Sequence, residues 1–175
     1  MNIRPLLLRV RPVVDDGRAA ALLLFLISAG LILGAYYFQY VRHYLPCELC
    51  FWERKPHFAL IALAPVAYAW RPARPYLLLV LGLVALGNAG LALFHVGVEE
   101  HWWPGLSTCS SPAQGVSMTA AELRKMLMES TVVPCDRAVW WFLGLSMAAW
   151  NGIASLCEAI IGLAGGAIAW RNRAK

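Results

Sequence analysis

Four cysteines carry the chemistry that this sequence most directly suggests. Cys47 and Cys50 form a close pair with two residues between them, whereas Cys109 and Cys135 lie further along the chain in a polar stretch. Two cysteines at the closer spacing can form a small disulfide ring, and such pairs often have a lowered thiol pKa, which favours the reactive thiolate. Apolar runs long enough to cross a bilayer lie between and around the pairs. Thiol–disulfide chemistry at a membrane face therefore predicts a lipid-soluble electron carrier.

Zinc binding and purely structural disulfides are the alternative roles for these cysteines. A zinc site would need a second close pair or histidines at ligand spacing, and no histidine lies between Cys109 and Cys135, so we predict no metal. A disulfide between Cys47 and Cys50 would close a loop too small to remove much entropy from the unfolded chain, and the membrane already constrains the fold. Structural disulfides remain the more serious alternative of the two.

The composition places the chain among multi-spanning membrane proteins. Of its 175 residues, 60% are hydrophobic and 14% are charged, whereas soluble domains average about 45–50% and about 25%. The formal net charge is +5, but the basic residues lie at the ends of apolar runs rather than in one patch, which argues against nucleic-acid binding. The length suits one domain, so we expect residues 1–175 to form a single integral membrane domain.

We expect four membrane helices, at about 19–41, 52–70, 76–98 and 148–170. A spanning helix needs about 20 apolar residues. The second run is the weakest because its fully apolar part is short, and it spans only if Arg54 and Lys55 snorkel outward. Glycines in the third and fourth runs predict close helix packing. The first run is longer than a signal-peptide core and has no evident cleavage site, so we expect it to be retained.

The lysines and arginines predict that both termini lie in the cytoplasm. More of them then lie inside than outside, and the short turn 70–75 carries arginines but no acidic residue. The loops at about 42–51 and 99–147 would face the periplasm of a bacterium, where disulfides persist. In the second loop, Thr119-Ala120-Ala121-Glu122 is typical of a capping box, so we expect a short amphipathic helix there. The predicted fold class is therefore an all-α membrane protein, a four-transmembrane-helix bundle with two periplasmic loops.

Arg54 and several aromatic residues could serve a flat quinoid ring. Arg54 follows Cys50 by about one helical turn, so it can stabilise a thiolate and donate hydrogen bonds to a carbonyl oxygen. From composition alone, an interfacial anchor is an equally good interpretation of this arginine. The aromatic residues near the outer surface fit an interfacial belt and could also wall such a ring: Phe51, Trp52, Trp102 and Trp103.

Together these residues resemble the disulfide bond formation protein B family, the bacterial inner-membrane quinone reductases that reoxidise a periplasmic dithiol oxidase. The resemblance rests on Pro46-Cys47-x-x-Cys50, on Glu53-Arg54, and on the later Cys109 and Cys135 within four expected spans. It covers nearly the whole chain. Further segments are similar to one branch of that family: 95–99, 102–105 and 141–147, followed by Trp150-Asn151.

The resemblance implies an electron path through the four cysteines. Cys109 and Cys135 would form the disulfide that a soluble thioredoxin-fold dithiol oxidase attacks, with the mixed disulfide on Cys109. Cys135 would then attack the Cys47–Cys50 disulfide and release Cys50, which would face the quinone as a thiolate, while Arg54 would hold the quinone. The quinone would be ubiquinone or menaquinone. An external electron acceptor is needed because an ordinary protein disulfide, with a potential near roughly −300 mV, cannot oxidise a partner dithiol whose potential is near roughly −120 mV.

One residue departs from the family pattern and keeps other functions open. Glu48 lies between the close cysteines, where an apolar residue is expected, and its charge would disfavour a nearby thiolate. A specialised paralogue that serves a narrow set of substrate proteins is therefore an alternative. A vitamin K epoxide reductase-like protein would carry the close pair in its last helix, where this chain has only Cys157. A non-enzymatic scaffold or small transporter with structural disulfides is a further alternative.

Several other polar or reactive residues lie in or near the apolar runs. Glu158 is either a proton relay to the reduced quinone or a protonated helix-contact residue, because intramembrane carboxylates are functional candidates by default. We expect Asn88 to make an interhelical hydrogen bond and Cys157 to be a small apolar filler. His101 could serve quinone or proton chemistry, but a plain surface histidine is the expectation. The other histidines carry no clear signal: His43, His57 and His95.

Overall fold

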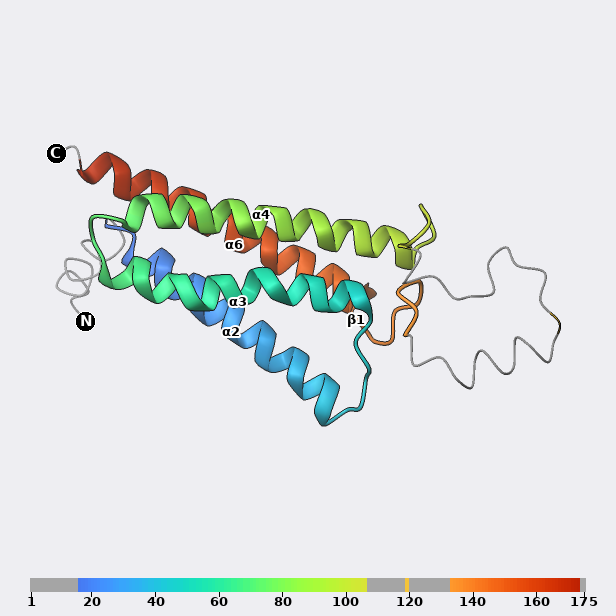
Figure 1. The fold of residues 1–175 in the computed structure, drawn as a ribbon. Coiled ribbons are helices and arrows are strands. Elements are labelled where there is room, and N and C mark those ends of the chain that lie inside the picture. The colour runs from blue at the N-terminus through green and yellow to red at the C-terminus, as the bar shows by residue number, and fades with distance from the viewer. Residues whose placement is uncertain (1–15, 107–118, 120–132, 174–175) are drawn as a thin grey trace, which may run out of the picture.

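Four long helices form the described part of the protein (Figure 1). The computed structural model describes residues 16–106, 119 and 133–173. The helices are α2 (Arg18–Tyr40), α3 (Glu48–Ala69), α4 (Arg74–Glu99) and α6 (Met147–Arg173). Helix α2 packs mainly on α3 and α6, and α4 packs mainly on the same two helices. The predominantly helical fold is thus confirmed, whereas the amphipathic helix predicted from Thr119 lies outside the described residues apart from Thr119 itself.

Three of the described helices are long and apolar enough to cross a bilayer: α2, α4 and α6. Helix α3 is similarly long, at 22 residues, but charged side chains in its first half lower its hydropathy. Two of its polar side chains, those of Glu53 and His57, are buried inside the bundle. The fold is therefore that of a multi-pass helical membrane protein, and a fourth span through α3 stays a prediction.

Helix α3 begins at Glu48 rather than at the predicted residue 52, because Cys47 caps it. The Cys47 Sγ accepts the backbone N–H of Cys50 at 3.3 Å, and the Cys47 carbonyl oxygen accepts that of Phe51. A side-chain acceptor here satisfies one of the free N–H groups that every helix start exposes. The close cysteine pair therefore lies at the first turn of a helix and not in a loop.

Helices α4 and α6 approach each other closely through glycines. A Cβ on Gly82 would lie 2.8 Å from the backbone nitrogen of Leu163, and a Cβ on Gly162 would lie 2.7 Å from the Cα of Gly82. A larger residue fits at neither position without a backbone shift, which confirms the packing role predicted for small residues in these runs. The adjoining core consists of leucines and alanines: Ala20, Ala21, Leu24, Leu60, Ala64, Ala67, Leu78, Leu81, Ala85 and Ala159.

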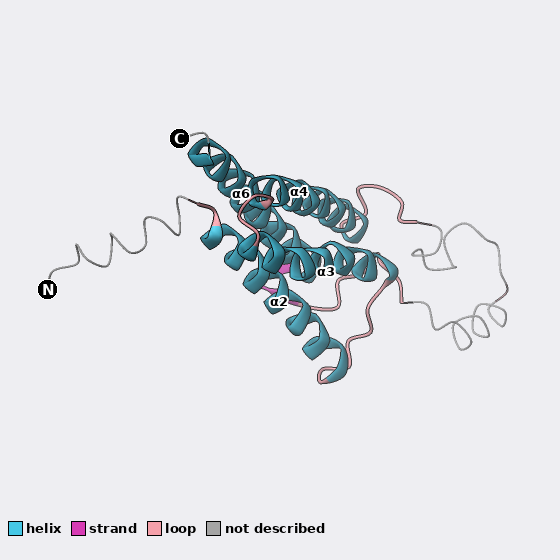
Figure 2. Ribbon diagram, turned by 60° about the vertical axis from the view of Figure 1, so that its left-hand side comes forward, coloured by secondary structure: helices cyan, strands magenta, loops and turns pink. Residues whose placement is uncertain are grey.

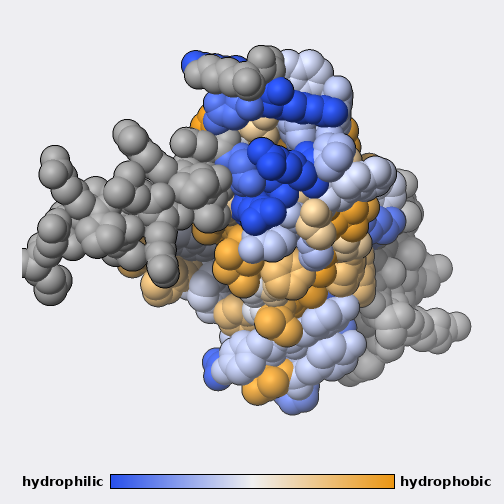
Figure 3. Space-filling view, turned by 90° about the vertical axis from the view of Figure 1, so that its left-hand side faces the viewer, coloured by the Kyte–Doolittle hydropathy of each residue, from blue (hydrophilic) through white to orange (hydrophobic). Residues whose placement is uncertain are grey.

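Hydrophilic side chains gather on part of one end of the bundle (Figure 3). Helix α2 begins and helix α6 ends on this side, beside the turn between α3 and α4 (Figure 1). Arg74 closes the turn: it donates hydrogen bonds to the carbonyl oxygens of Ala67 and Tyr68 and pairs with Asp16 at 2.9 Å. The exposed arginines at this end are Arg18, Arg71, Arg171 and Arg173.

The opposite end holds a short hairpin that the sequence patterns did not predict (Figure 2). Strand β1 (Trp141–Phe142) pairs antiparallel with β2 (Leu145–Ser146). Leu143 and Gly144 between them both have positive φ, as a two-residue type I′ turn requires. Strands of two residues are too short to show the alternation that identifies a strand, which is why this segment was expected to be loop.

Candidate active site

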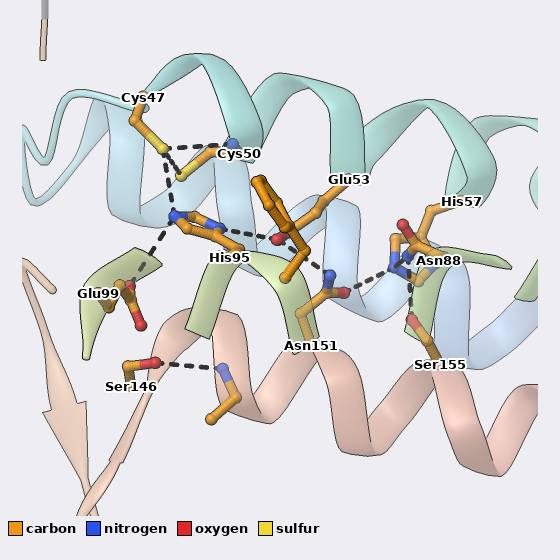
Figure 4. A network of polar contacts seen from close by, with 12 residues as sticks. Cys47, Cys50, Glu53, His57, Asn88, His95, Glu99, Ser146, Asn151 and Ser155 are labelled. Atoms are coloured by element: carbon orange, nitrogen blue, oxygen red, sulfur yellow. Dashed lines mark hydrogen bonds and ion pairs between the residues drawn. The ribbon is translucent and has the colours of Figure 1, made fainter. Parts of the chain in front are cut away.

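The close cysteine pair lies where α3 begins, at the end of the bundle opposite the turn between α3 and α4 (Figures 1 and 4). The two Sγ atoms are 2.8 Å apart and both thiols are free. Cys47 is buried and Cys50 is half-buried. Small side-chain rotations would bring the sulfurs to the bonding distance of about 2.05 Å. The geometry therefore suits a disulfide that opens and closes.

Cys47 is the sulfur whose thiolate this geometry favours. The hydrogen bond from the Cys50 side chain lowers the pKa of Cys47 below its ordinary value; the Cys50 backbone N–H adds to this effect, while burial and the nearby carboxylates of Glu53 and Glu99 oppose it. The prediction assigned the quinone-facing thiolate to Cys50. That prediction concerns a different state, in which Cys47 is bonded to Cys135, so it stays a prediction.

Cys135 lies against the close pair. It is 1% exposed and belongs to one buried cluster with Cys47, Leu49 and Val98. Cys135 is disulfide-bonded, while Cys109 lies outside the described residues, so the predicted pairing of these two cysteines stays a prediction. The fold nevertheless brings two of the four predicted redox cysteines, Cys47 and Cys135, into one packed cluster although they are far apart in the sequence.

Helix α4 adds His95 to the cysteine pair, which the sequence analysis missed (Figure 4). The His95 Nε2 lies 3.6 Å from the Cys47 Sγ, and its Nδ1 lies 2.7 Å from Oε1 of Glu53. His95 and Glu53 are both buried, at 3% and 6% exposure. An imidazole between a thiol and a carboxylate can accept a proton on one nitrogen and give it up on the other. The only local signal was that His95 lies close to the outer end of its apolar run.

The same imidazole completes a set of three potential metal ligands. The ligand atoms of Cys47, Cys50 and His95 lie within 4.8 Å of one another. The prediction of no metal relied on sequence spacing, which cannot show a histidine brought in by another helix. Tetrahedral zinc with Zn–S bonds of about 2.3 Å would hold its two sulfurs ~3.8 Å apart, further than the 2.8 Å here. The pair as it stands suits a disulfide better, and the absence of metal stays a prediction.

A cavity of about 330 Å³ opens beside the close cysteine pair. This volume lies within the range of small-molecule pockets. Along α3, the cavity is lined by Cys50, Glu53, Arg54 and His57. Its other walls, from α2, the hairpin region and the start of α6, are mainly apolar and aromatic: Leu31, Ile32, Phe38, Val139, Trp140, Phe142, Met147 and Trp150. The site therefore combines thiols, a cation and an apolar chamber.

The aromatic walls of this cavity are not those that the sequence suggested. Phe51, Trp52, Trp102 and Trp103 do not line it. Trp103 instead stacks on Phe94, with ring centroids 5.9 Å apart, and donates its indole N–H to the Phe94 carbonyl oxygen. These four aromatic residues are all exposed, which agrees with the interfacial belt that was the other interpretation.

Arg54 lines the cavity and is held there by α2. Its Nη1 donates to the Gln39 Oε1 at 2.6 Å. Its guanidinium lies 5.6 Å from the centroid of the Tyr36 ring and 5.2 Å from that of Phe51, both cation–π distances. These contacts fix a cation at the wall of an apolar chamber. The role predicted for Arg54, to hold a carbonyl oxygen, is compatible with this position and stays a prediction.

Buried polar side chains continue from the cysteine pair into the bundle (Figure 4). Asn151 Nδ2 donates to Glu53 Oε2 at 3.0 Å, and Asn151 Oδ1 lies 2.8 Å from His57 Nε2. Asn88 donates to the Ser155 hydroxyl at 3.0 Å, between α4 and α6, which confirms its predicted interhelical hydrogen bond. His57 is a second histidine that the sequence analysis missed, because its partners come from other helices.

Neighbouring residues of α6 face different environments. Glu158 is fully buried, whereas Cys157 is exposed and free. Successive helical residues point about 100° apart, so burying the carboxyl group turns the thiol outward. Cys157 therefore lies on the outer surface of the bundle, and its predicted role as a small apolar filler at membrane depth stays a prediction. His101 is exposed, as expected of a surface histidine.

Comparisons with known proteins agree with one another. A family model described as "Disulfide bond formation protein DsbB" matches residues 17–165. Disulfide bond formation protein B of Xylella fastidiosa (strain Temecula1) is 30% identical over 162 residues, which cover 89% of this chain and 93% of that protein. The protein of the same name from Methylococcus capsulatus is 34% identical over 148 residues, 78% of this chain and 86% of its own. An uncharacterized protein of Rickettsia prowazekii, RP370, is 30% identical over 149 residues, 83% and 86% of the two chains. No solved structure matches the chain significantly.

Proposed function

This chain belongs to the DsbB family of disulfide bond formation proteins, and we propose that it is a thiol:quinone oxidoreductase of the bacterial inner membrane. It reoxidises a periplasmic thioredoxin-fold dithiol oxidase and passes the electrons to a membrane quinone, so that disulfides are made de novo. The observation that carries this proposal is a single cavity lined by both the close cysteine pair and Arg54.

The residues around the cavity fit a quinone. A flat ring with carbonyl oxygens needs apolar walls and a few polar groups, and the cavity has aromatic walls with Arg54, Glu53 and His57 on one side. Arg54 would hold a carbonyl oxygen, since a guanidinium has five N–H donors and Gln39 accepts from one of its nitrogens. When bound, the quinone supplies an acceptor for two electrons and two protons.

The cysteines carry the electrons from the soluble partner to the cavity. The partner dithiol attacks the Cys109–Cys135 disulfide through Cys109, and the freed Cys135 thiolate attacks Cys47, against which it packs. This second exchange forms a Cys135–Cys47 bond and releases Cys50, which lines the cavity. The partner's second thiol then displaces Cys109 from the mixed disulfide, and Cys109 re-forms its bond with Cys135, which frees Cys47. Two thiols of the partner thereby become a disulfide, and two electrons reach the close pair.

His95 and Glu53 receive the proton that a thiol of the close pair gives up. The His95 Nε2 is the nitrogen nearest to Cys47, at 3.6 Å, and its Nδ1 bonds Glu53 at 2.7 Å. Glu53 lines the cavity, so a proton taken at the thiol can leave at the cavity wall. The imidazole and the carboxylate thereby couple thiol chemistry to proton transfer.

We also propose that α3 is the fourth span and that both termini are cytoplasmic. The side chains that α3 turns outward beyond its first turns are mostly apolar, such as Phe58, Leu63 and Val66, while Glu53 and His57 are buried. The end of the bundle with the exposed arginines, where α2 begins and α6 ends, fits the cytoplasmic side, and the cysteines then face the periplasm.

The test uses purified full-length protein in detergent with reduced dithiol oxidase and a short-chain ubiquinone or menaquinone. We expect the ultraviolet absorbance of the quinone to change at a rate that requires Cys50 and Cys109, so that Cys50→Ser and Cys109→Ser are inactive. Cys157→Ser is the matched control, because this thiol is free and exposed, and it should retain the wild-type rate.

The outcome that would remove the proposal is a wild-type protein that changes neither quinone nor partner. The disulfides would then be structural, and the protein would be a membrane scaffold or a transporter. A wild type that turns over with only one of several dithiol partners would instead favour the paralogue with a narrow set of substrates.

A further inference from the structure

A second histidine–carboxylate pair lies further along α3 than the cysteine site. Glu158 of α6 is 0% exposed, and its Oε2 lies 3.4 Å from Nδ1 of His57. The Ser28 hydroxyl of α2 donates to Glu158 Oε1 at 2.6 Å and lies 3.3 Å from the same His57 Nδ1. Side chains from three helices thus converge on one buried carboxyl group, in a bundle whose other inward-facing residues are mostly apolar.

This carboxyl group is short of hydrogen bonds. Among the described residues, Glu158 Oε2 and Asn88 Oδ1 are buried without a hydrogen-bond partner. An unpaired buried oxygen in a folded protein requires an explanation, because its desolvation is not compensated. A proton held between Glu158 Oε2 and His57 Nδ1 provides one, because it removes both the unpaired oxygen and the need for two separate buried charges.

The second nitrogen of His57 leads toward the cavity. Nε2 lies 2.8 Å from Oδ1 of Asn151, and both His57 and Asn151 line the cavity. Asn151 Nδ2 donates to Glu53, so it is the Asn151 oxygen, which only accepts hydrogen bonds, that faces Nε2, and Nε2 carries a hydrogen toward it. The Asn88 amide nitrogen also lies 3.1 Å from Nε2, and it donates to Ser155. The imidazole therefore has a buried carboxyl group at one nitrogen and an N–H at the cavity wall at the other.

The titratable groups that face His57 come from two helices. Glu158 of α6 contacts it directly, and Glu53 of α3 is reached through Asn151. Helix α2 contributes the Ser28 hydroxyl and α4 contributes the Asn88 amide, neither of which titrates. His57 thus has carboxyl groups on both sides, and Arg54, one helical turn earlier on α3, lines the same cavity.

We propose that His57 donates a proton to the quinone and that Glu158 supplies that proton through the imidazole. His57 lies seven residues beyond Cys50 on α3, about 10 Å along the helix, so it would serve the part of the ring away from the thiols. As Nε2 gives its proton to a quinone oxygen, Nδ1 takes the proton of Glu158. His57 is then a catalytic residue and Glu158 acts through it. This inference rests on the proposed function, since it requires a quinone in the cavity.

The protons balance with the thiols. Oxidation of the close cysteine pair to a disulfide releases two electrons and two protons, and reduction of a quinone to a quinol consumes two of each. One proton reaches the quinone from Glu158 through His57, and the other comes from a thiol by way of His95 and Glu53. The second thiol proton then restores the inner pair through the cavity that Glu53 and His57 both line.

Two near-isosteric substitutions test this role in the full-length protein. Glu158→Gln keeps the shape of the carboxyl group but cannot supply a proton, and His57→Gln keeps a polar side chain without an imidazole. We expect kcat for quinone reduction to fall about 100-fold in each, the usual size of a lost general acid. The KM for quinone and the quinone-independent thiol exchange with the partner should stay unchanged. The double variant should be no slower than either single variant, since both residues handle one proton.

Ser155→Ala is the matched control. Ser155 is as buried as Glu158 and bonds Asn88 in the same cluster, but it contacts neither His57 nor Glu158 by a hydrogen bond of the described residues. It should reduce quinone close to the wild-type rate. If kcat for quinone reduction falls in Ser155→Ala as far as in the two test variants, any loss of a polar group in this cluster is harmful, and the proposal is overturned.

Infrared spectroscopy of the quinone-free protein measures directly whether the Glu158 carboxyl group is protonated. The wild type should show a carboxylic-acid band that shifts in deuterated buffer only slowly, as a buried group does. Glu158→Gln should remove the band, His57→Gln should move it, and Ser155→Ala should leave it in place. A spectrum without such a band, or with one that Glu158→Gln leaves unchanged, would overturn the proposal even if a variant were too unstable for kinetics.

The failures of the two ideas are distinguishable. A wild type that reduces no quinone removes the proposed function and this inference with it. A wild type that reduces quinone normally, beside His57→Gln and Glu158→Gln variants that do so at the rate of Ser155→Ala, overturns the inference alone. A raised KM with unchanged kcat in the test variants would assign His57 to quinone binding and would likewise overturn proton donation.

Discussion

Two histidine–carboxylate pairs occupy different positions along the same bundle. The outer pair, His95 and Glu53, is joined at 2.7 Å and has a cysteine sulfur within reach of the imidazole. The inner pair, His57 and Glu158, is joined at 3.4 Å, and the other groups described around it are hydroxyls and amides. The same two side-chain types can therefore serve different chemistry. A pair beside a thiol can couple proton transfer to electron transfer, whereas a pair without a thiol can only transfer protons.

Asn151 stands between the two pairs. Its Nδ2 donates to Glu53 of the outer pair, and its Oδ1 lies at hydrogen-bond distance from His57 of the inner pair. An amide neither gains nor loses a proton near neutral pH, so Asn151 cannot hand protons from one pair to the other. We infer that it is a positioning residue that orients both, and that protons cross between the pairs through the cavity that Glu53 and His57 both line.

Removing the proton-accepting group of the outer pair should have the largest effect. We expect Glu53→Gln to lower kcat for quinone reduction about 100-fold or more, because the Nδ1 of His95 then has no carboxylate to which it can pass the thiol proton, while Glu99 lies 3.9 Å from the other nitrogen, Nε2. Gln also turns an N–H₂ group toward a donor of Asn151 or His95, so one hydrogen bond is lost as well. The measurement is steady-state quinone reduction with reduced partner protein.

Glu100→Gln is the control for Glu53→Gln, because Glu100 is exposed at the end of α4. The two substitutions remove the same charge, so a general electrostatic effect on the partner would appear in both. Equal rates in the two variants would mean that the outer pair does not accept thiol protons. The comparison between an electron-linked pair and a proton-only pair would then lose its basis.

The sequence predicted the elements of this site better than their assembly. Cys47, Cys50 and Arg54 could be found because they lie within one short segment with a recognisable spacing. His95, His57 and Asn151 could not, because each acquires its meaning from a residue on another helix, 42, 94 or 98 positions away in the chain. Spacing rules describe neighbours on one helix and carry no information on which faces of different helices meet.

The number of membrane spans is also hard to predict from sequence patterns alone. Hydropathy identifies α2, α4 and α6 because lipid-facing residues dominate them. Helix α3 is less apolar because it contributes Glu53 and His57 to the interior, so the feature that makes it functional is the one that weakens its hydropathy signal. Glu158 was noticed because it interrupts an apolar run, but its partner His57 lies in the run whose pattern is already poor.

Removing the Asn151 amide, which links the two pairs, should lower the stability of the protein. Asn151→Ala leaves one oxygen of Glu53 and the Nε2 of His57 without their partners. Each buried polar group that loses its partner costs about 1–3 kcal/mol, so for these two groups we expect the free energy of unfolding to fall by about 2–6 kcal/mol. The measurement is reversible unfolding in mixed micelles, with Cys157→Ala as the control, because that exposed thiol has no such partner to leave behind.

A double-mutant cycle in the Asn151→Ala background measures whether this amide couples the two pairs. If Asn151 orients both pairs, the effects of Glu53→Gln and Glu158→Gln on kcat should interact in the wild-type background and become additive in Asn151→Ala. Additive effects in both backgrounds would mean that the two pairs work independently of this amide, and would leave Asn151 with a role in stability alone.

The smallest expected effect is the pH dependence of the outer site. The Cys50 side chain donates to Cys47 and lowers its pKa, so in the reduced protein alkylation of Cys47 should reach half its maximal rate below the ordinary thiol pKa of about 8.5. Because the folded-state pKa is the lower one, the associated stabilisation of the reduced protein is complete above the unfolded pKa and is lost as the pH falls through the folded pKa. Cys50→Ala removes the main donor and should move the midpoint upward, whereas Cys157→Ala should not move it. A midpoint that stays low in Cys50→Ala would mean that the helix start, rather than the second thiol, stabilises the Cys47 thiolate, and that the outer site does not need a pair of cysteines to prepare its nucleophile.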